Sequence, residues 1–230
     1  MKTIGILGGM SWESSALYYK IINEATHAQL GGQHNARSVM VTVDFDTIEQ
    51  LQHADRWDEA AAILREAAQA LERAGADFIL IATNTMHKLL PQIREGVSIP
   101  FLHIAQATAD AIQQRGLTRI GLLGTRFTME EDFYKQILID NGIDVVIPKK
   151  SERDLIHKVI YNELCLGTIE SASKDAYLDI IARMEQDNAI EGVILGCTEI
   201  GMLISQEDLT LPVFDTTEIH ALSAVSEALR

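Results

Sequence analysis

The stretch FILIATNTMH, residues 78–87, holds an apolar run that ends abruptly in small polar residues. The later stretch GVILGCTEIG, residues 192–201, repeats this pattern, with Cys197 where the earlier stretch has Thr83. A short apolar run bounded by turn-forming residues predicts a buried strand, and the polar residues then follow its carboxyl end. The chain therefore carries one structural pattern twice, with a different reactive atom in each copy.

Apolar runs of the same kind alternate with amphipathic stretches along the whole chain. Eight are short and rich in Val, Ile, Leu or Phe: TIGILG, SVMVTVDF, DFILIAT, IPFLHI, RIGLLG, DVVIP, GVILGC and LPVFD. Between most of them lie helical patterns such as RWDEAAAILREAAQALERAGA and SASKDAYLDIIARMEQDNA. Fully apolar strands separated by helices predict an α/β fold with mostly parallel sheets flanked by helices.

The two halves of the chain also resemble each other. Three pairs of segments recur in the same order, at offsets of 116, 114 and 112 residues. They are IGILGGMS at Ile4 with IGLLGTRF at Ile120, ILIATNT at Ile79 with VILGCTE at Val193, and IPFLHI at Ile99 with LPVFDT at Leu211. The repeat predicts two pseudo-symmetric lobes, residues 1–103 plus 211–230 and residues 104–210, with the active site in the cleft between them.

Ligands of open α/β sheets bind beyond the carboxyl ends of the strands. This rule selects the residues that follow the predicted strands: Gly8, Gly9, Met10, Ser11, Thr83, Asn84 and Thr85 in the first lobe, and Gly124, Thr125, Cys197, Thr198 and Glu199 in the second. Backbone N–H groups at helix starts favour a carboxylate. The same residue types are also good helix N-caps, so a single position fits either role. Two related triplets, residues 83–85 and 197–199, favour a binding site for a small polar ligand.

Cys197 follows a predicted strand and precedes a predicted helix. A helix N-terminus lowers the pKa of a thiol below its ordinary value of about 8.5, which predicts a nucleophile or base at this position. Cys165 falls within a predicted helix, where a free cysteine usually packs as a small hydrophobe. Two cysteines form no disulfide framework, and free thiols suit a reducing compartment, so we expect a cytoplasmic protein.

Composition and motifs argue against several other classes of protein. The formal net charge of −14 disfavours nucleic acid as a partner, and no apolar segment is long enough to predict a membrane span. GILGGMS lacks both the dinucleotide fingerprint and the Walker lysine. The seven histidines show no paired ligand spacing, so no metal is expected.

Six motifs make the whole chain resemble the aspartate/glutamate racemase family: GILGGMSWESS, LQHADRW, ATNTMH, LLGTRFTMEEDFY, IYNELCLG and ILGCTEI. That family works without pyridoxal phosphate, so the resemblance implies an isomerase that needs no cofactor. Its members carry one cysteine on each of two lobes. One thiolate removes the α-proton of an amino acid while the opposing thiol donates another. By motif position the second family cysteine falls on Cys197, and the first falls on Thr83.

This departure from the family pattern suggests an asymmetric racemase. The resemblance implies that Cys197 deprotonates the L-isomer of aspartate or glutamate, with Thr83 on the reprotonating face, either directly or through a water. The D-isomer should then be a poor substrate, which is a claim about rates only. The resemblance also implies that Glu199 orients Cys197, that the protein is a homodimer, and that the substrate is contacted by Met10, Gln52, Asn84, Thr85, Thr125, Thr128 and Thr198.

Two alternatives stay open on the sequence alone. Arylmalonate decarboxylases resemble these racemases and use a single cysteine, which is what Thr83 leaves in this chain. A non-catalytic protein that binds a small acid would also explain a two-lobed repeat. No basic residue for a substrate side-chain carboxylate is identified, so a broader range of amino acids than aspartate and glutamate is also open.

Overall fold

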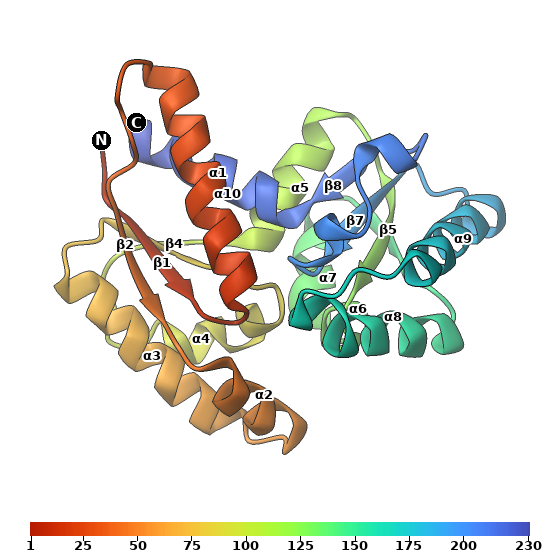
Figure 1. Cartoon of the computed structure of the whole chain (residues 1–230), viewed down its shortest axis with the longest axis horizontal. Helices are drawn as coiled ribbons and strands as arrows, with labels where there is room; N and C mark the ends of the chain where they lie inside the picture. The colour runs from red at the N-terminus through yellow and green to blue at the C-terminus, as the bar shows by residue number, and fades with distance from the viewer. The chain divides into compact units, whose positions relative to one another are not determined.

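The computed structural model describes residues 1–230. The chain forms two compact units: unit 1 comprises Met1–Ile104 and His220–Arg230, and unit 2 comprises Ala105–Ile219. Each unit contains a four-stranded sheet in which every neighbouring pair of strands is parallel (Figure 1). All eight apolar runs contain a strand, so the predicted α/β class is confirmed.

Unit 1 has the strand order β2-β1-β3-β4. Its strands are β1 (Ile4–Gly8), β2 (Ser38–Thr42), β3 (Phe78–Ile81) and β4 (Phe101–Leu102). Its helices are α1 (Trp12–Leu30), α2 (Phe45–His53), α3 (Trp57–Arg73), the 3-10 helix η1 (Thr85–Leu89) and α4 (Leu90–Ile93), together with most of α10 (Thr216–Leu229).

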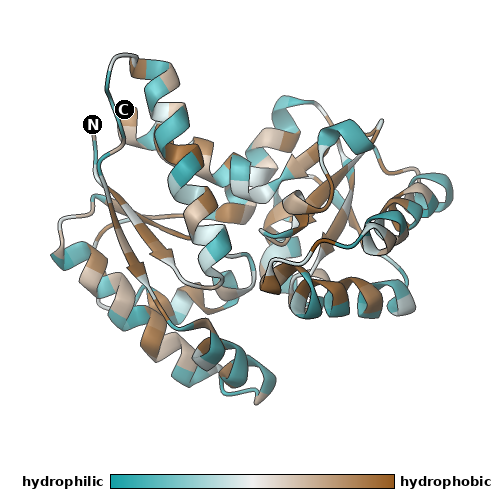
Figure 2. Ribbon diagram, in the orientation of Figure 1, coloured by the Kyte–Doolittle hydropathy of each residue, from teal (hydrophilic) through white to brown (hydrophobic).

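The sheet of unit 1 is covered on both faces because its central strands are apolar at every position. Leu7 and Ile79 belong to a core shared with α2, α3 and α4. Ile6 and Phe78, one residue earlier on the same strands, belong to a second core shared with α1 and α10. Because the side chains of a strand alternate between the two faces of the sheet, each face packs against its own layer of helices. Figure 2 shows the consequence, with hydrophobic colour along β1 and an alternation of hydrophobic and hydrophilic colour along α3.

Unit 2 has the equivalent strand order, β6-β5-β7-β8, as the sequence repeat predicts. Its strands are β5 (Arg119–Gly124), β6 (Asp144–Val146), β7 (Gly192–Gly196) and β8 (Val213–Asp215). Its helices are α5 (Ile104–Gln114), α6 (Arg126–Glu130), α7 (Asp132–Asp140), α8 (Lys150–Asn162) and α9 (Ser171–Asn188), with short 3-10 helices η2 (Leu164–Leu166), η3 (Ile200–Met202) and η4 (Gln206–Asp208). None of the helices is both long enough and apolar enough to cross a membrane.

The second boundary between the units differs from the prediction. The sequence placed the return to the first lobe at residue 211, whereas in the structure unit 2 continues to Ile219. The reason is β8, which pairs in parallel with β7, Val193 opposite Val213, and so completes the second sheet. The chain then passes from unit 2 to unit 1 within α10.

Candidate active site

The predicted residues of unit 1 gather at the carboxyl edge of its sheet. β1 and β3 are neighbours, with Leu7 opposite Ile81, so the segments that follow them lie side by side. The Ser14 hydroxyl donates to the Ala82 carbonyl over 3.3 Å and ties the first turn of α1 to the loop after β3. At this edge Met10, Gln52, Asn84 and Thr85 are buried, and Thr83 is half-buried.

The GGMSWESS segment folds into a compact turn that starts α1. Gly9 has φ +88°, and a side chain there would collide with the Val43 backbone, so only glycine fits. The Gly9 N–H donates to the Ser15 hydroxyl over 2.8 Å, and that hydroxyl donates to the Ser11 carbonyl over 2.8 Å. The Ser11 hydroxyl caps α1 by accepting the Ser14 N–H. The backbone next to Met10 is therefore held in place.

The buried acceptor atoms of unit 1 that have no hydrogen-bond partner include the Gln52 Oε1 and the Glu13 Oε2. A buried acceptor left unsatisfied costs about 1–3 kcal/mol, so each atom calls for a donor from a water or a ligand. Gln52 was predicted from the resemblance, but Glu13 was missed. An acidic residue in the first turn of a helix is ordinary, so the sequence offered no signal that set Glu13 apart.

In unit 2 the carboxyl ends of β5 and β7 approach closely because two glycines, Gly124 and Gly196, lie opposite each other. A Cβ on Gly196 would lie 2.7 Å from the Leu123 carbonyl oxygen. Thr125 follows Gly124 directly and caps α6, since its hydroxyl accepts the Thr128 N–H over 3.3 Å. The two hydroxyl groups are 3.2 Å apart, and Thr128 is fully buried. Thr125 is therefore the N-cap of α6, and the predicted substrate contacts of Thr125 and Thr128 stay predictions.

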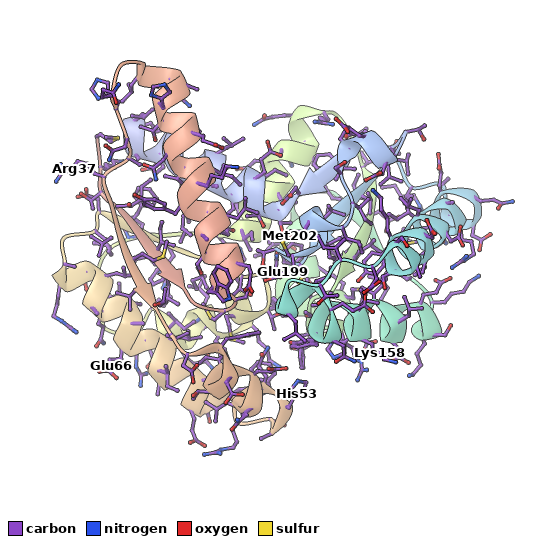
Figure 3. The ribbon with its side chains drawn as sticks, viewed as in Figure 1. Arg37, His53, Glu66, Lys158, Glu199 and Met202 are labelled. Carbon is purple, nitrogen blue, oxygen red and sulfur yellow. The ribbon has the colours of Figure 1, made fainter.

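In the turn after β7, two side chains donate hydrogen bonds to the same oxygen atom of a third side chain. The Cys197 thiol donates to Glu199 Oε2 over 3.0 Å, and the Thr198 hydroxyl donates to the same oxygen over 2.9 Å. All three residues are buried, with Cys197 8% exposed. Figure 3 marks Glu199 and Met202 on the turn that ends in η3. Unit 2 thus holds a thiol and a carboxylate in direct contact.

The predicted low pKa of Cys197 is wrong for this structure. Burial raises the pKa of the Cys197 thiol well above its ordinary value, and the negative charge of Glu199 raises it further. The segment after Cys197 is a three-residue 3-10 turn rather than an α-helix, so no helix macrodipole opposes these effects. Cys197 is therefore a protonated thiol at neutral pH, and a base must remove its proton before it can act.

The predicted place of the other cysteine differs from the structure. Cys165 lies in the 3-10 turn η2, half-buried, rather than in an α-helix. No group of three or more His, Cys, Asp or Glu side chains is arranged to hold a metal ion.

Comparisons with known proteins agree with this fold. The Asp/Glu/Hydantoin racemase family matches residues 7–224. A crystal structure from Yersinia pestis, of a protein assigned to the Asp/Glu racemases, is 48% identical over the whole of both chains, with a TM-score of 0.92. An aspartate racemase homologue from Pyrococcus horikoshii OT3 is 35% identical over the whole of both chains, with a TM-score of 0.87.

A match found by sequence points to the same family. The broad specificity amino-acid racemase RacX of Bacillus subtilis (strain 168) is 25% identical over 186 residues, which cover 77% of each chain. The family match spans nearly the whole chain, including the segments around Thr83 and Cys197. This chain is therefore a member of the Asp/Glu/hydantoin racemase family.

Proposed function

We propose that the protein is a cofactor-independent racemase that interconverts the L- and D-isomers of aspartate and glutamate, or of a broader set of amino acids. Cys197 removes the α-proton of the L-isomer, and Thr83 faces the opposite side of the α-carbon. The observation that supports this most directly is the buried Cys197 thiol in hydrogen-bond contact with Glu199, in a chain of this family.

Glu199 gives Cys197 a route to the reactive thiolate. The thiol proton already points at Glu199 Oε2, 3.0 Å away, so transfer to that carboxylate needs no rearrangement. The Thr198 hydroxyl holds the same oxygen in place. When a substrate enters, the positive charge of its α-ammonium group favours the thiolate, because an opposite charge nearby stabilises the ionised form. Substrate binding and activation of Cys197 are then coupled.

Thr83 plays a different part from Cys197. An alcohol is far less acidic than a thiol, so Thr83 is not a base in the resting protein. It donates a proton to the carbanion, directly or through a water that it positions. In this proposal Gln52 Oε1, buried and without a protein partner, accepts a hydrogen bond from the α-ammonium group, while Asn84 and Thr85 supply donors to the α-carboxylate.

The asymmetry has a specific kinetic form. L- and D-isomers have equal free energies, so kcat/KM for racemisation is the same in both directions, and a low kcat for the D-isomer requires a proportionally low KM. Asymmetry instead appears in hydrogen exchange. After removing the proton of the L-isomer, Cys197 can return a solvent deuteron to the same face, so the L-isomer exchanges without inverting. The D-isomer has no thiol on its own face, so it exchanges mainly as it inverts.

Incubation of the purified protein in D2O with each isomer of aspartate and glutamate tests the proposal. NMR follows loss of the α-proton, and chiral chromatography follows the mirror-image product. We expect the L-isomer to lose its α-proton faster than it inverts, and the D-isomer to lose it only at the rate of inversion. Equal exchange-to-inversion ratios for the two isomers would contradict the assignment of Thr83.

The two cysteines provide a matched pair of variants. Cys197→Ala should abolish both exchange and inversion, whereas Cys165→Ser should retain both. An active Cys197→Ala protein would exclude the proposed chemistry. Absence of exchange with all four acidic substrates in the unaltered protein would exclude aspartate and glutamate, and the same assay would then be applied to other amino acids and to arylmalonates.

A further inference from the structure

Three of the seven histidines lie together inside unit 1, although they come from separate segments. The ring of His87, in η1, is centred 4.5 Å from the ring of His103 and 5.9 Å from that of His220, in α10. His87 and His220 are buried. No part of the proposed chemistry uses this group, which we name the histidine cluster.

The hydrogen bonds of His87 define where its proton lies. Nδ1 is 2.8 Å from the Thr83 carbonyl oxygen, which can only accept, so Nδ1 carries the proton. Nε2 is 3.3 Å from the backbone nitrogen of Ile104, whose N–H can only donate, so Nε2 carries none. His87 is therefore a neutral imidazole in the Nδ1–H form.

Burial and the two neighbouring histidines keep His87 neutral. Both effects lower the pKa of His87 well below 6.5, and burial lowers the pKa of His103 to about 4. A second proton on Nε2 would also point directly at the Ile104 N–H. The ring thus keeps its donor on Thr83 and its acceptor on Ile104 at neutral pH.

These contacts hold the loop that carries Thr83. The Thr83 N–H donates to the Ile81 carbonyl over 2.9 Å, and the Thr83 carbonyl accepts from His87. The neighbouring carbonyls are also engaged, Ala82 by the Ser14 hydroxyl and Asn84 by the His87 N–H over 3.1 Å. The backbone around Thr83 is held on both sides, and Thr83 itself is half-buried rather than buried. Ile104, the other partner of His87, is the last residue of unit 1 before the chain enters unit 2.

We propose that His87 is a positioning residue for Thr83: its neutral ring fixes the Thr83 carbonyl relative to the Ile104 amide and so sets the direction in which the Thr83 hydroxyl points. This inference rests on the proposed role of Thr83. It assigns His87 to the reprotonating step alone, because its ring bonds the Thr83 carbonyl and the Ile104 N–H, both in unit 1. Loss of the Nδ1 contact should therefore impair inversion and spare exchange at the L-face.

Two substitutions separate the two contacts of His87. The amide of His87→Asn can place an N–H close to the position of Nδ1 and keep a donor for the Thr83 carbonyl. The longer side chain of His87→Gln reaches the position of Nε2 and keeps an acceptor for Ile104, but it loses the Thr83 bond. Tyr18→Phe is the control, since it removes a buried 2.9 Å hydrogen bond to His220 in the same cluster without touching Thr83.

The measurement is the ratio of inversion to α-deuterium exchange for the L-isomer in D2O. We expect His87→Gln to lower this ratio about 10- to 100-fold, with exchange itself retained, since misplacement of a reacting group by about 1 Å costs up to 100-fold. His87→Asn and Tyr18→Phe should keep the ratio of the unaltered protein. A general structural role would lower exchange and inversion together, and that result, or an unchanged ratio in His87→Gln, would overturn the inference.

NMR of the imidazole nitrogens in the unaltered protein is a second test of the inference. It does not require any variant to fold. ¹⁵N NMR should show His87 with a protonated Nδ1 and an unprotonated Nε2 from pH 8 down to about pH 6. An Nε2–H form or a charged ring in this range would overturn the inference. A different result would refute the proposed function, namely exchange that persists in Cys197→Ala. That result is independent of the protonation state of His87.

Discussion

Cys197 and Thr83 occupy corresponding places in the two units, yet their surroundings differ. Cys197 lies next to a carboxylate that accepts the hydrogen bond of its thiol. The Thr83 hydroxyl is presented by a loop whose backbone carbonyls are bonded to Ser14 and His87. In the proposed mechanism the carboxylate is the base for the thiol proton, and the bonded loop holds Thr83 in position. At the scale of single residues, this difference supports a one-thiol mechanism.

Removal of the Glu199 charge should make the Cys197 thiol more acidic. Glu199 raises the Cys197 pKa through its negative charge and by accepting the thiol hydrogen bond, so Glu199→Gln should lower this pKa. The pH dependence of iodoacetamide alkylation measures it, in a Cys165→Ser background that leaves one cysteine. A pKa that stays the same or rises would show that Glu199 does not control the thiol.

A thiol at position 83 should make the two faces of the site more alike. Thr83→Cys places an acidic group where the alcohol stands, so the D-isomer should gain exchange without inversion. Deuterium exchange into D-aspartate and D-glutamate, measured with a reductant present, tests this expectation. Thr83→Ser, which keeps the alcohol, is the matched control and should leave the D-isomer pattern unchanged. Equal behaviour of the two variants would argue against a role for Thr83 at that face.

At the scale of elements, the ends of β5 and β7 are defined by a pair of glycines. Gly124 and Gly196 lie opposite each other and precede Thr125 and Cys197. A side chain on Gly196 would press on the Leu123 carbonyl oxygen, and Gly196 is not in the left-handed region, so the requirement there is close packing rather than conformation. Strand packing therefore sets the position of the thiol.

Gly196→Ala should change the environment of Cys197, whereas Gly116→Ala should not. Overpacking at Gly196 costs about 1–3 kcal/mol of the free energy of unfolding and displaces the start of the turn that holds Cys197. Gly116 has φ +68° and open space around it, so alanine there costs only backbone strain of about 1–2 kcal/mol. Urea unfolding and the alkylation rate of Cys197 measure the two effects. An alkylation rate unchanged in Gly196→Ala would refute the link between this packing and the thiol.

At the scale of the whole molecule, buried histidines link the fold of unit 1 to pH. His220 donates through Nε2 to the Leu102 carbonyl over 2.9 Å and accepts the Tyr18 hydroxyl at Nδ1, so it is neutral in the fold. Burial lowers the pKa of His220 to about 4. In the unfolded chain the pKa is about 6.5, so between these values the unfolded state binds more protons. Stability from this group is fully present above pH 6.5 and is lost as the pH falls toward 4.

The free energy of unfolding should therefore be lower at pH 5 than at pH 7, with His220 contributing about 2 kcal/mol of the difference. Urea denaturation at the two pH values measures it. His220→Gln keeps a donor for the Leu102 carbonyl and cannot take up a proton in this range. This variant should be less stable at pH 7 but show a smaller loss on acidification. An equal loss in both proteins would exclude His220 as the source.

The homodimer implied by the resemblance is also a property of the whole molecule and stays a prediction. Light scattering coupled to size-exclusion chromatography would report twice the mass of the 25.4 kDa chain if it holds.

The sequence by itself determined the α/β class, the eight strands, the repeated topology and the edge of each sheet where polar residues gather. These features depend on local hydrophobic pattern and on the parallel arrangement that such strands adopt, so short stretches contain the information. The position of β8 could have been inferred in the same way, because its counterpart β4 completes the first sheet.

The tertiary structure alone decided the properties that depend on burial and on contacts between distant residues. It shows that burial and Glu199 raise the pKa of Cys197, where the sequence suggested the opposite, and that Thr125 caps a helix. It also places an unpartnered Glu13 oxygen at the strand ends of unit 1 and brings residues 87, 103 and 220 into one cluster. Desolvation and hydrogen-bond direction are set by atoms that the packed fold brings together, so no local pattern encodes them.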